Sequence, residues 1–229
     1  MKEIGVNIIS FDFDDKYDDV MKKLNHSKME NKLKMIYVET PANPTNTLID
    51  LNMVEKIKKT IQDKTDSEII SVCDNTYLGP IWQSPLDFGI DLTCYSATKF
   101  LNGHSDVIAG AVMGSKSVIS QVKYLRTFLG GMIAPYTAWL LTRSLETLHV
   151  RMNYQAENSI KIVEFLKTHE NVTDIFYPGD ENMNQSQKAI FKSQCTHGGA
   201  MIAFTVVGNE KGAFKFLDSL KIIKLAVSL

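Results

Sequence analysis

The sequence predicts an α/β fold with a mainly parallel sheet flanked by helices. Short apolar runs alternate with amphipathic helical patterns through the first half of the 229-residue chain, as in βαβ units. Hydrophobic residues make up 44% of the chain, which is enough for a core at this length. Glu39, Asp74 and Ser96 each close an apolar run, and ligands of such folds bind at the carboxyl ends of strands.

The first half of the chain supplies most of the expected sheet. A helix is expected over residues 51–62 because Leu51, Val54, Ile57 and Ile61 recur at helical spacing, and another over residues 16–24. Five apolar runs of strand length predict strands at 5–11, 35–39, 69–74, 92–95 and 107–113.

The second half begins with a helical region and then returns to mixed elements. Helical patterns cover residues 118–128, 134–148 and 152–167. Beyond them we expect a strand at 172–177, a helix at 186–193, a strand at 200–207, a helix at 210–220 and an apolar run at 222–227. We place a domain junction in the helical region, which divides the chain into residues 1–148 and 149–229.

Composition excludes several classes of partner. Lysine plus arginine (25) nearly balances aspartate plus glutamate (26) and no long basic run occurs, so neither nucleic acid nor a membrane surface is expected as a partner. The three cysteines, Cys73, Cys94 and Cys195, are odd in number and indicate reduced thiols in the cytoplasm. No secretory core and no apolar segment of membrane-spanning length is present. A small-molecule substrate is therefore expected.

The most informative segment is Ser96-Ala97-Thr98-Lys99, which follows a buried strand 25 residues after Asp74. A lysine amine can condense with the aldehyde of pyridoxal 5'-phosphate, hydroxyls can bind the phosphate, and a carboxylate can keep the pyridine nitrogen protonated. The competing interpretation is a solvated surface lysine and a turn-capping aspartate. Apolar neighbours of Lys99 and the apolar strand that precedes Asp74 favour the cofactor, because a carboxylate there needs a cation.

The chain resembles the pyridoxal-phosphate-dependent enzymes of cysteine and methionine metabolism, the trans-sulfuration family, and within it the cystathionine and methionine γ-lyases. The matching segments, in family order, are 39–44 (ETPANP), 74–77 (DNTY), 96–106 (SATKFLNGHSD), 145–152 (LETLHVRM), 177–179 (YPG), 198–201 (GGAM) and 226–229 (AVSL). This resemblance implies the fold-type-I architecture of aspartate aminotransferase, with a large cofactor domain and the start of a smaller C-terminal α/β domain.

The resemblance assigns a role to each cofactor-binding position. Lys99 would carry the cofactor and shuttle protons, and Asp74 would pair with the pyridine nitrogen. Ser96 and Thr98 would contact the phosphate, and Thr76 would help to hold the ring.

The remaining site positions concern the substrate and a possible metal. The resemblance implies that Asn43 meets the cofactor's phenolic oxygen and the substrate carboxylate, and that Ser228 also meets that carboxylate. Glu39 is as well explained by a structural role as by a functional one. His104 and Asp106 fall short of a closed metal site, so no metal is expected.

The implied reaction is γ-elimination from methionine, cystathionine or a related amino acid, giving a 2-oxo acid, ammonia and a thiol. Cystathionine γ-synthase or O-acylhomoserine sulfhydrylase activity is the alternative within the family. Residues 126–131 lack the Lys-Asp pair typical of methionine γ-lyases, which favours a cystathionine γ-lyase-like or mixed activity. The intact family member is expected to form a homodimer or homotetramer.

The family's phosphate loop, its cofactor-stacking tyrosine and its substrate-clamping arginine have no counterpart in this sequence. We therefore expect a chain truncated at both ends, and an inactive fragment is the other alternative.

Overall fold

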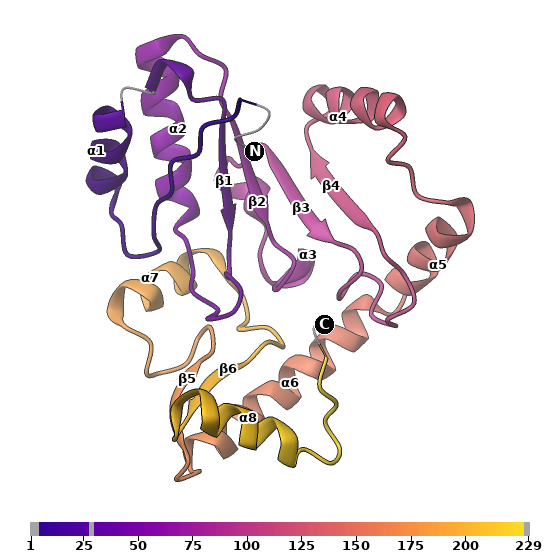
Figure 1. Cartoon of the computed structure of the whole chain (residues 1–229). Helices are drawn as coiled ribbons and strands as arrows, with labels where there is room; N and C mark the ends of the chain where they lie inside the picture. Colours follow the sequence, from indigo (N-terminus) through magenta and orange to yellow (C-terminus); the bar gives the residue numbers. More distant parts are fainter. Residues whose placement is uncertain (1–4, 28–29, 227–229) are drawn as a thin grey trace.

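The structure is a computed structural model that describes residues 5–27 and 30–226. Its centre is a four-stranded sheet in the order β1 (Met35–Glu39), β2 (Ile70–Asp74), β3 (Leu92–Ser96) and β4 (Gly110–Gly114). β1, β2 and β3 are parallel, whereas β4 runs antiparallel to β3 (Figure 1). The α/β class with a mainly parallel sheet is thus confirmed.

The prediction of a strand at residues 5–11 is wrong. The segment is irregular, and Val6 and Ile8 are 41% and 61% exposed. A cavity of about 870 Å³ is lined both by residues 5–13 and by β1. The apolar residues of this segment suit a strand, but without a neighbour to accept its backbone hydrogen bonds the segment does not become one.

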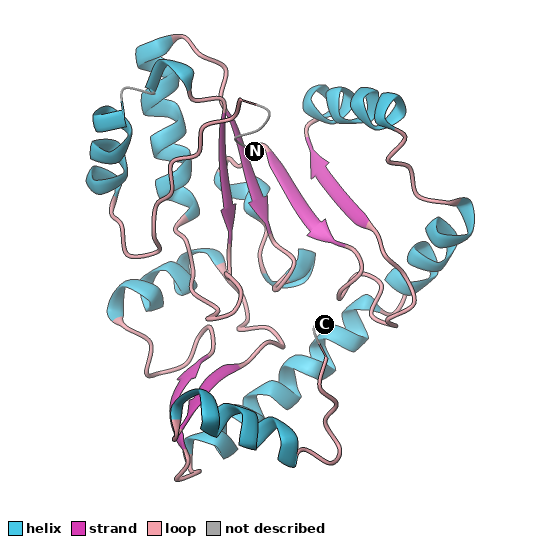
Figure 2. Ribbon diagram, viewed as in Figure 1, coloured by secondary structure: helices cyan, strands magenta, loops and turns pink. Residues whose placement is uncertain are grey.

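Two helices cover one side of the sheet beside β1 and β2 (Figures 1 and 2). α2 (Leu51–Thr65) begins at Asp50, whose carboxylate accepts a hydrogen bond from the backbone N–H of Asn52 at 2.9 Å. α1 (Tyr17–Ser27) lies against α2, and a short 3₁₀ turn, η2 (Glu30–Lys32), follows it. The core between these elements contains residues Val20, Leu24, Ile36, Val38, Leu51, Val54, Ile57, Ile61 and Cys73.

A second core joins β3 to the helical region. α3 (Gly79–Trp82) and the 3₁₀ turn η3 (Pro85–Phe88) connect β2 to β3, and α4 (Lys116–Leu129), α5 (Pro135–Leu145) and α6 (Leu148–Lys167) follow β4. The helices predicted at 134–148 and 152–167 are thus present, with the break between them near Glu146. The buried residues of this core are Leu78, Trp82, Tyr95, Ala97, Leu101, Leu148, Met152 and Ala156.

The C-terminal part forms a smaller lobe below the sheet in Figure 1, and α6 runs into it. It contains the antiparallel pair β5 (Val172–Phe176) and β6 (Ala203–Val206), with α7 (Gln185–Gln194) and α8 (Asn209–Ser219). The domain boundary at residue 148 stays a prediction. Within the described residues, the helices are too short or too polar to cross a bilayer.

Buried amides connect the two lobes. Gln187 accepts a hydrogen bond from the N–H of Leu48 at 2.7 Å and donates to the carbonyl of Leu48 at 2.8 Å. Gln194 likewise bridges the N–H of Leu51 and the carbonyl of Ile49, at 3.1 and 3.0 Å. The α7 side chains thereby satisfy the backbone at the start of α2, where a helix has free N–H groups.

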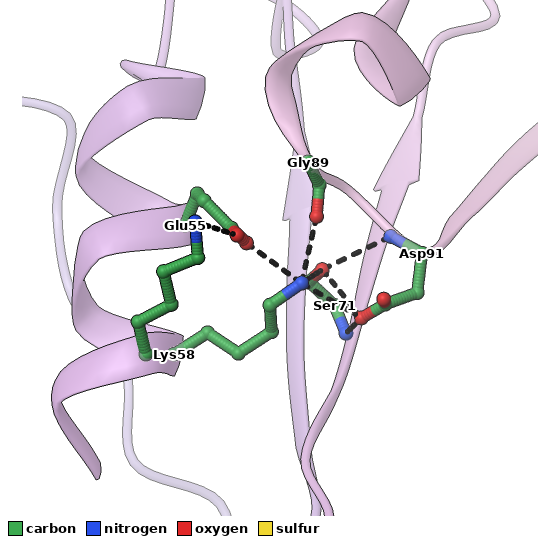
Figure 3. A network of polar contacts seen from close by, with 6 residues as sticks. Glu55, Lys58, Ser71, Gly89 and Asp91 are labelled. Carbon is green, nitrogen blue, oxygen red and sulfur yellow. Dashed lines mark hydrogen bonds and ion pairs between the residues drawn. The ribbon is translucent and has the colours of Figure 1, made fainter. Parts of the chain in front are cut away.

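A buried lysine connects α2 to the sheet (Figure 3). Lys58 Nζ donates to Ser71 Oγ at 3.2 Å, to the Gly89 carbonyl at 2.7 Å and to Asp91 Oδ2 at 3.1 Å. Its three N–H bonds are then used, so the 2.7 Å contact with Glu55 Oε2 is ionic. Burial alone would raise the pKa of Asp91, but Ser71 and Lys58 lower it below its ordinary value of 3.8.

We expect Lys58→Met to lower the free energy of unfolding by about 3 kcal/mol, because it leaves two carboxylates without their shared cation in a poorly solvated site. Lys59→Met is the matched control: Lys59 also pairs with Glu55, but its side chain is 69% exposed against 7% for Lys58, so its loss should cost less than about 1 kcal/mol. Urea unfolding of both variants measures the difference.

The difference in the free energy of unfolding between the wild type and Lys58→Met should depend on pH. Because the folded-state pKa of Asp91 is lowered, its stabilising contribution is present above the unfolded-state pKa and is lost as the pH falls through the folded-state value. The gap between wild type and Lys58→Met should therefore narrow below about pH 4. An equal effect of the two lysine variants at neutral pH would contradict the buried network.

Candidate active site

Parallel pairing of three strands gathers polar side chains at one edge of the sheet. The register places Glu39 opposite Asp74, and Asp74 opposite Cys94, two residues before Ser96. These carboxyl ends of the strands point toward the smaller lobe in Figure 1. The prediction that Glu39, Asp74 and Ser96 close neighbouring strands is therefore confirmed, and the candidate site is built on this edge.

The Asp74 carboxylate is held in one orientation by Thr76. Asp74 Oδ1 accepts hydrogen bonds from the Thr76 backbone N–H at 3.0 Å and from the Thr76 hydroxyl at 2.6 Å. The same hydroxyl accepts from the Ser96 backbone N–H at 2.8 Å, which fixes its proton toward Asp74. Asp74 Oδ2 lies 3.4 Å from the Tyr37 hydroxyl. Among the described residues, Oδ1 thus has two hydrogen-bond donors, whereas Oδ2 has a single long contact.

The negative charge of Asp74 acts on its neighbours. Burial raises the pKa of the Cys94 thiol, and the Asp74 charge raises it further. Burial also raises the pKa of Glu39; the Asn43 N–H partly opposes this, and the Asp74 charge adds to it. Among the described residues other than Lys99, no lysine, arginine or histidine forms an ion pair with Asp74. A half-buried carboxylate in this setting favours a cationic ligand.

Lys99 lies in a tight turn directly after β3. Its N–H donates to the Ser96 carbonyl at 3.0 Å, and its carbonyl accepts from the Gly103 N–H at 2.7 Å. Its neighbours Ala97 and Leu101 are buried in the core, whereas Lys99 itself is half-buried. The turn thus holds the lysine backbone at the edge of the sheet where Asp74 lies.

The two predicted phosphate hydroxyls differ in what they already bind. Thr98 Oγ1 accepts from the Ala109 N–H at 3.0 Å and donates to the Ala109 carbonyl at 3.3 Å, which ties the lysine turn to the segment leading into β4. The Ser96 hydroxyl makes no hydrogen bond to any other described residue, so it is the readier donor to an anion. The phosphate role of Ser96 and Thr98 stays a prediction.

The remaining positions singled out from the sequence are Asn43, Ser228 and the pair His104 and Asp106. Asn43 is exposed, and its N–H lies 3.4 Å from Glu39 Oε1; Ser228 lies outside the described residues. His104 contacts the Asn102 carbonyl at 2.7 Å, and Asp106 accepts from the Asn102 amide at 2.9 Å. No group of three or more metal-ligating side chains occurs within residues 5–27 and 30–226.

Tyr37 is a further member of this site, which the sequence pattern did not predict. Its hydroxyl reaches Asp74 from the neighbouring strand, although the residue is 55% exposed. Side chains alternate between the two faces of a strand, so Tyr37 and Glu39 lie on the same face of the sheet. This spacing of two residues could have identified Tyr37 from the sequence.

Comparison with known proteins decides the family. The sequence pattern of the family described as Cys/Met metabolism PLP-dependent enzyme matches residues 1–229. The chain belongs to this family. L-methionine γ-lyase from Treponema denticola is 41% identical over 198 residues, which are 86% of this chain and 48% of that enzyme. The chain therefore spans about half the length of the curated relatives it matches.

Solved structures show the same fold. Cystathionine γ-lyase from Lactobacillus plantarum, in complex with L-serine, aligns with 100% of this chain and 56% of its own, with a TM-score of 0.87 and 34% identity. Cystathionine γ-synthase from Xanthomonas oryzae pv. oryzae, in complex with aminoacrylate and cysteine, aligns with 91% of this chain and 52% of its own, with a TM-score of 0.81 and 34% identity. The predicted fold of pyridoxal-phosphate-dependent enzymes is thereby confirmed.

The residues present fit the cofactor of this family. A protonated pyridine nitrogen is the kind of cation that the oriented Asp74 carboxylate favours, and Lys99 offers an amine at the same edge of the sheet. The Ser96 hydroxyl is available to a phosphate oxygen. The fit rests on the hydrogen bonds that orient Asp74 and on the chemistry of this donor set.

The charge on Asp74 can be tested through a cysteine. Asp74→Asn should lower the pKa of Cys94, because it removes the second cause of the elevation and leaves only burial. Cys195 is an internal control, since burial alone raises its pKa to about 12. The measurement is the rate of iodoacetamide alkylation of each cysteine against pH, read by peptide mass spectrometry. A Cys94 profile that does not move would mean that Asp74 is not charged beside it.

Proposed function

We propose that this protein is a pyridoxal-phosphate-dependent lyase that cleaves sulfur amino acids by γ-elimination to a 2-oxo acid, ammonia and a thiol. The observation that carries the proposal is that Asp74 ends β2 and Lys99 follows the neighbouring parallel strand β3, with the carboxylate oriented by Thr76. The name of the Treponema denticola relative, L-methionine γ-lyase, supports the choice of reaction.

When bound, pyridoxal phosphate supplies an electron sink for the carbanion left by loss of the substrate α-proton. Lys99 would hold the cofactor through Nζ and, once displaced by the substrate amine, would move protons to and from the substrate carbons at that atom. Asp74 would hold the proton on the pyridine nitrogen, because a carboxylate fixed at this position favours the protonated ring. Thr76 would keep Asp74 in place.

The remaining site residues would bind anions. The Ser96 hydroxyl would donate to the phosphate, and Thr98 would join it by releasing the long 3.3 Å bond to the Ala109 carbonyl. Asn43 and Ser228 would meet the substrate carboxylate. No metal is required by these roles.

A second candidate reaction is γ-replacement, as in a cystathionine γ-synthase or an O-acylhomoserine sulfhydrylase. Likeness to the Xanthomonas oryzae cystathionine γ-synthase favours it, since the structural agreement is close to that with the γ-lyase. Both reactions begin at the same Lys99 and Asp74. The site residues described therefore do not distinguish γ-elimination from γ-replacement. The two reactions are distinguished by assaying the substrates of each.

We also propose a cellular location, a domain division and an oligomeric state for the protein. Three free cysteines support a cytoplasmic location, and we place the division between the cofactor domain and the smaller domain at residues 148 and 149. Exposed apolar side chains on α4 and α5 support association with further copies of the chain as a homodimer or homotetramer; they include Tyr124, Phe128, Leu129, Tyr136 and Trp139.

Lys99 should be the lysine that pyridoxal phosphate modifies. With excess cofactor and borohydride, we expect the phosphopyridoxyl label to concentrate at Lys99, and the visible absorption band to be lost in Lys99→Ala but kept in the control Lys123→Ala, an exposed lysine on α4. Asp74→Asn should keep the labelled position but require about tenfold more cofactor, because an ion pair to the ring nitrogen is lost. A band that persists in Lys99→Ala would overturn the assignment.

The chain by itself should be a poor catalyst. We expect 2-oxo acid production from methionine or cystathionine at least about a hundredfold slower than by the intact Treponema denticola enzyme, because few of the described side chains can hold the phosphate and the substrate carboxylate. Cystathionine formation from an O-acylhomoserine and cysteine is assayed in parallel and would favour γ-replacement. Rates equal to those of the intact enzyme would show that this chain builds a complete site.

A further inference from the structure

One guanidinium ties the turn that follows Lys99 to the junction of α5 and α6. Arg151 donates from Nη1 to the Phe100 carbonyl at 3.0 Å, from Nη2 to the Ser144 carbonyl at 3.0 Å and from Nε to Thr147 Oγ1 at 3.0 Å. Three donors of a rigid planar group therefore meet three acceptors, one of which belongs to the residue directly after Lys99.

The turn is shaped to receive this guanidinium. Gly103 has a φ of +73°, and a Cβ atom built there would lie 1.9 Å from Arg151 Nη1. Its N–H donates to the Lys99 carbonyl at 2.7 Å, so the residue that makes room for the arginine also closes the lysine turn.

A second tie runs beside the first. The buried Ser144 hydroxyl donates to Asn102 Oδ1 at 3.2 Å, and the Asn102 N–H donates to the Ala97 carbonyl at 3.1 Å. The turn is thus held from β3 on one side and from the α5–α6 junction on the other. Since a lysine side chain is long and flexible, the direction in which Nζ can reach depends on how firmly its backbone is fixed.

We propose that Arg151 is a positioning residue for Lys99: by holding the Phe100 carbonyl against the α5–α6 junction, it fixes the turn from which Nζ reaches the cofactor. This inference rests on the proposed function, because it takes Lys99 as the cofactor-binding lysine. Arg151 lies in the segment 145–152, one of those that resemble the family.

The test has one readout with the cofactor and one without it, both on the full chain. In Arg151→Met we expect the share of borohydride-trapped phosphopyridoxyl label at Lys99, relative to surface lysines, to fall at least about fivefold, and hydrogen exchange at the Asn102 and Gly103 amides to become about tenfold faster, as for loss of a charged hydrogen bond. Arg151→Lys should resemble Arg151→Met, because one ammonium cannot replace the three-pronged contact. Arg143→Met, an exposed arginine on α5, is the matched control and should change neither readout.

A milder variant covers the case in which Arg151→Met does not fold. Thr147→Val removes the Nε acceptor and the 3.2 Å hydrogen bond from the Thr147 hydroxyl to the Ser144 carbonyl, but keeps the Arg151 bond to Phe100, so it should give a smaller change of the same sign in both readouts. Wild-type labelling and exchange in a folded Arg151→Met variant would overturn the proposal. Faster exchange in Arg151→Met, with Lys99 unlabelled even in the wild type, would also overturn it, but by refuting the proposed function rather than the contact.

Discussion

Parallel pairing of β1, β2 and β3 places every central group of the candidate site, because parallel strands end on one edge of a sheet and bring their last residues together. The register sets Asp74 beside both Glu39 and Cys94. The Thr76 hydroxyl then spans from Asp74 to the backbone of Ser96, so the orientation of the carboxylate depends on the pairing of β2 with β3.

The second lobe is held to this edge by polar contacts as well as by packing. Gln187 and Gln194 each satisfy both a donor and an acceptor of the backbone that leads into α2. The Asn46 amide adds hydrogen bonds to the carbonyls of Phe176 and Met201, at 2.9 and 3.1 Å. Such contacts require one relative placement of the lobes, since a buried amide that loses its partners is costly.

Local sequence patterns predicted those elements that can be recognised from their own residues alone. Helical spacing located α2, and polar residues after apolar runs located Asp74 and Lys99. The prediction at residues 5–11 failed for a different reason. An apolar run can indicate a strand, but a strand exists only where another strand pairs with it, and that partner is not encoded in the segment. The antiparallel direction of β4 likewise depends on how the turn after Lys99 reverses the chain. The environment of Arg151 comes from segments about fifty residues apart, so spacing along the chain could not reveal it.

The buried cation of α2 also limits how the sequence can change. Replacing Lys58 alone leaves Glu55 and Asp91 without their common partner, whereas exchanging all three for well-packed apolar residues can be neutral in a protein interior. The two arrangements differ at three positions. A series of single substitutions that leads from one to the other therefore passes through a protein with an unpaired buried charge. Either carboxylate can be lost while Lys58 keeps the other as its partner, so the lysine constrains the sequence more than either acid does.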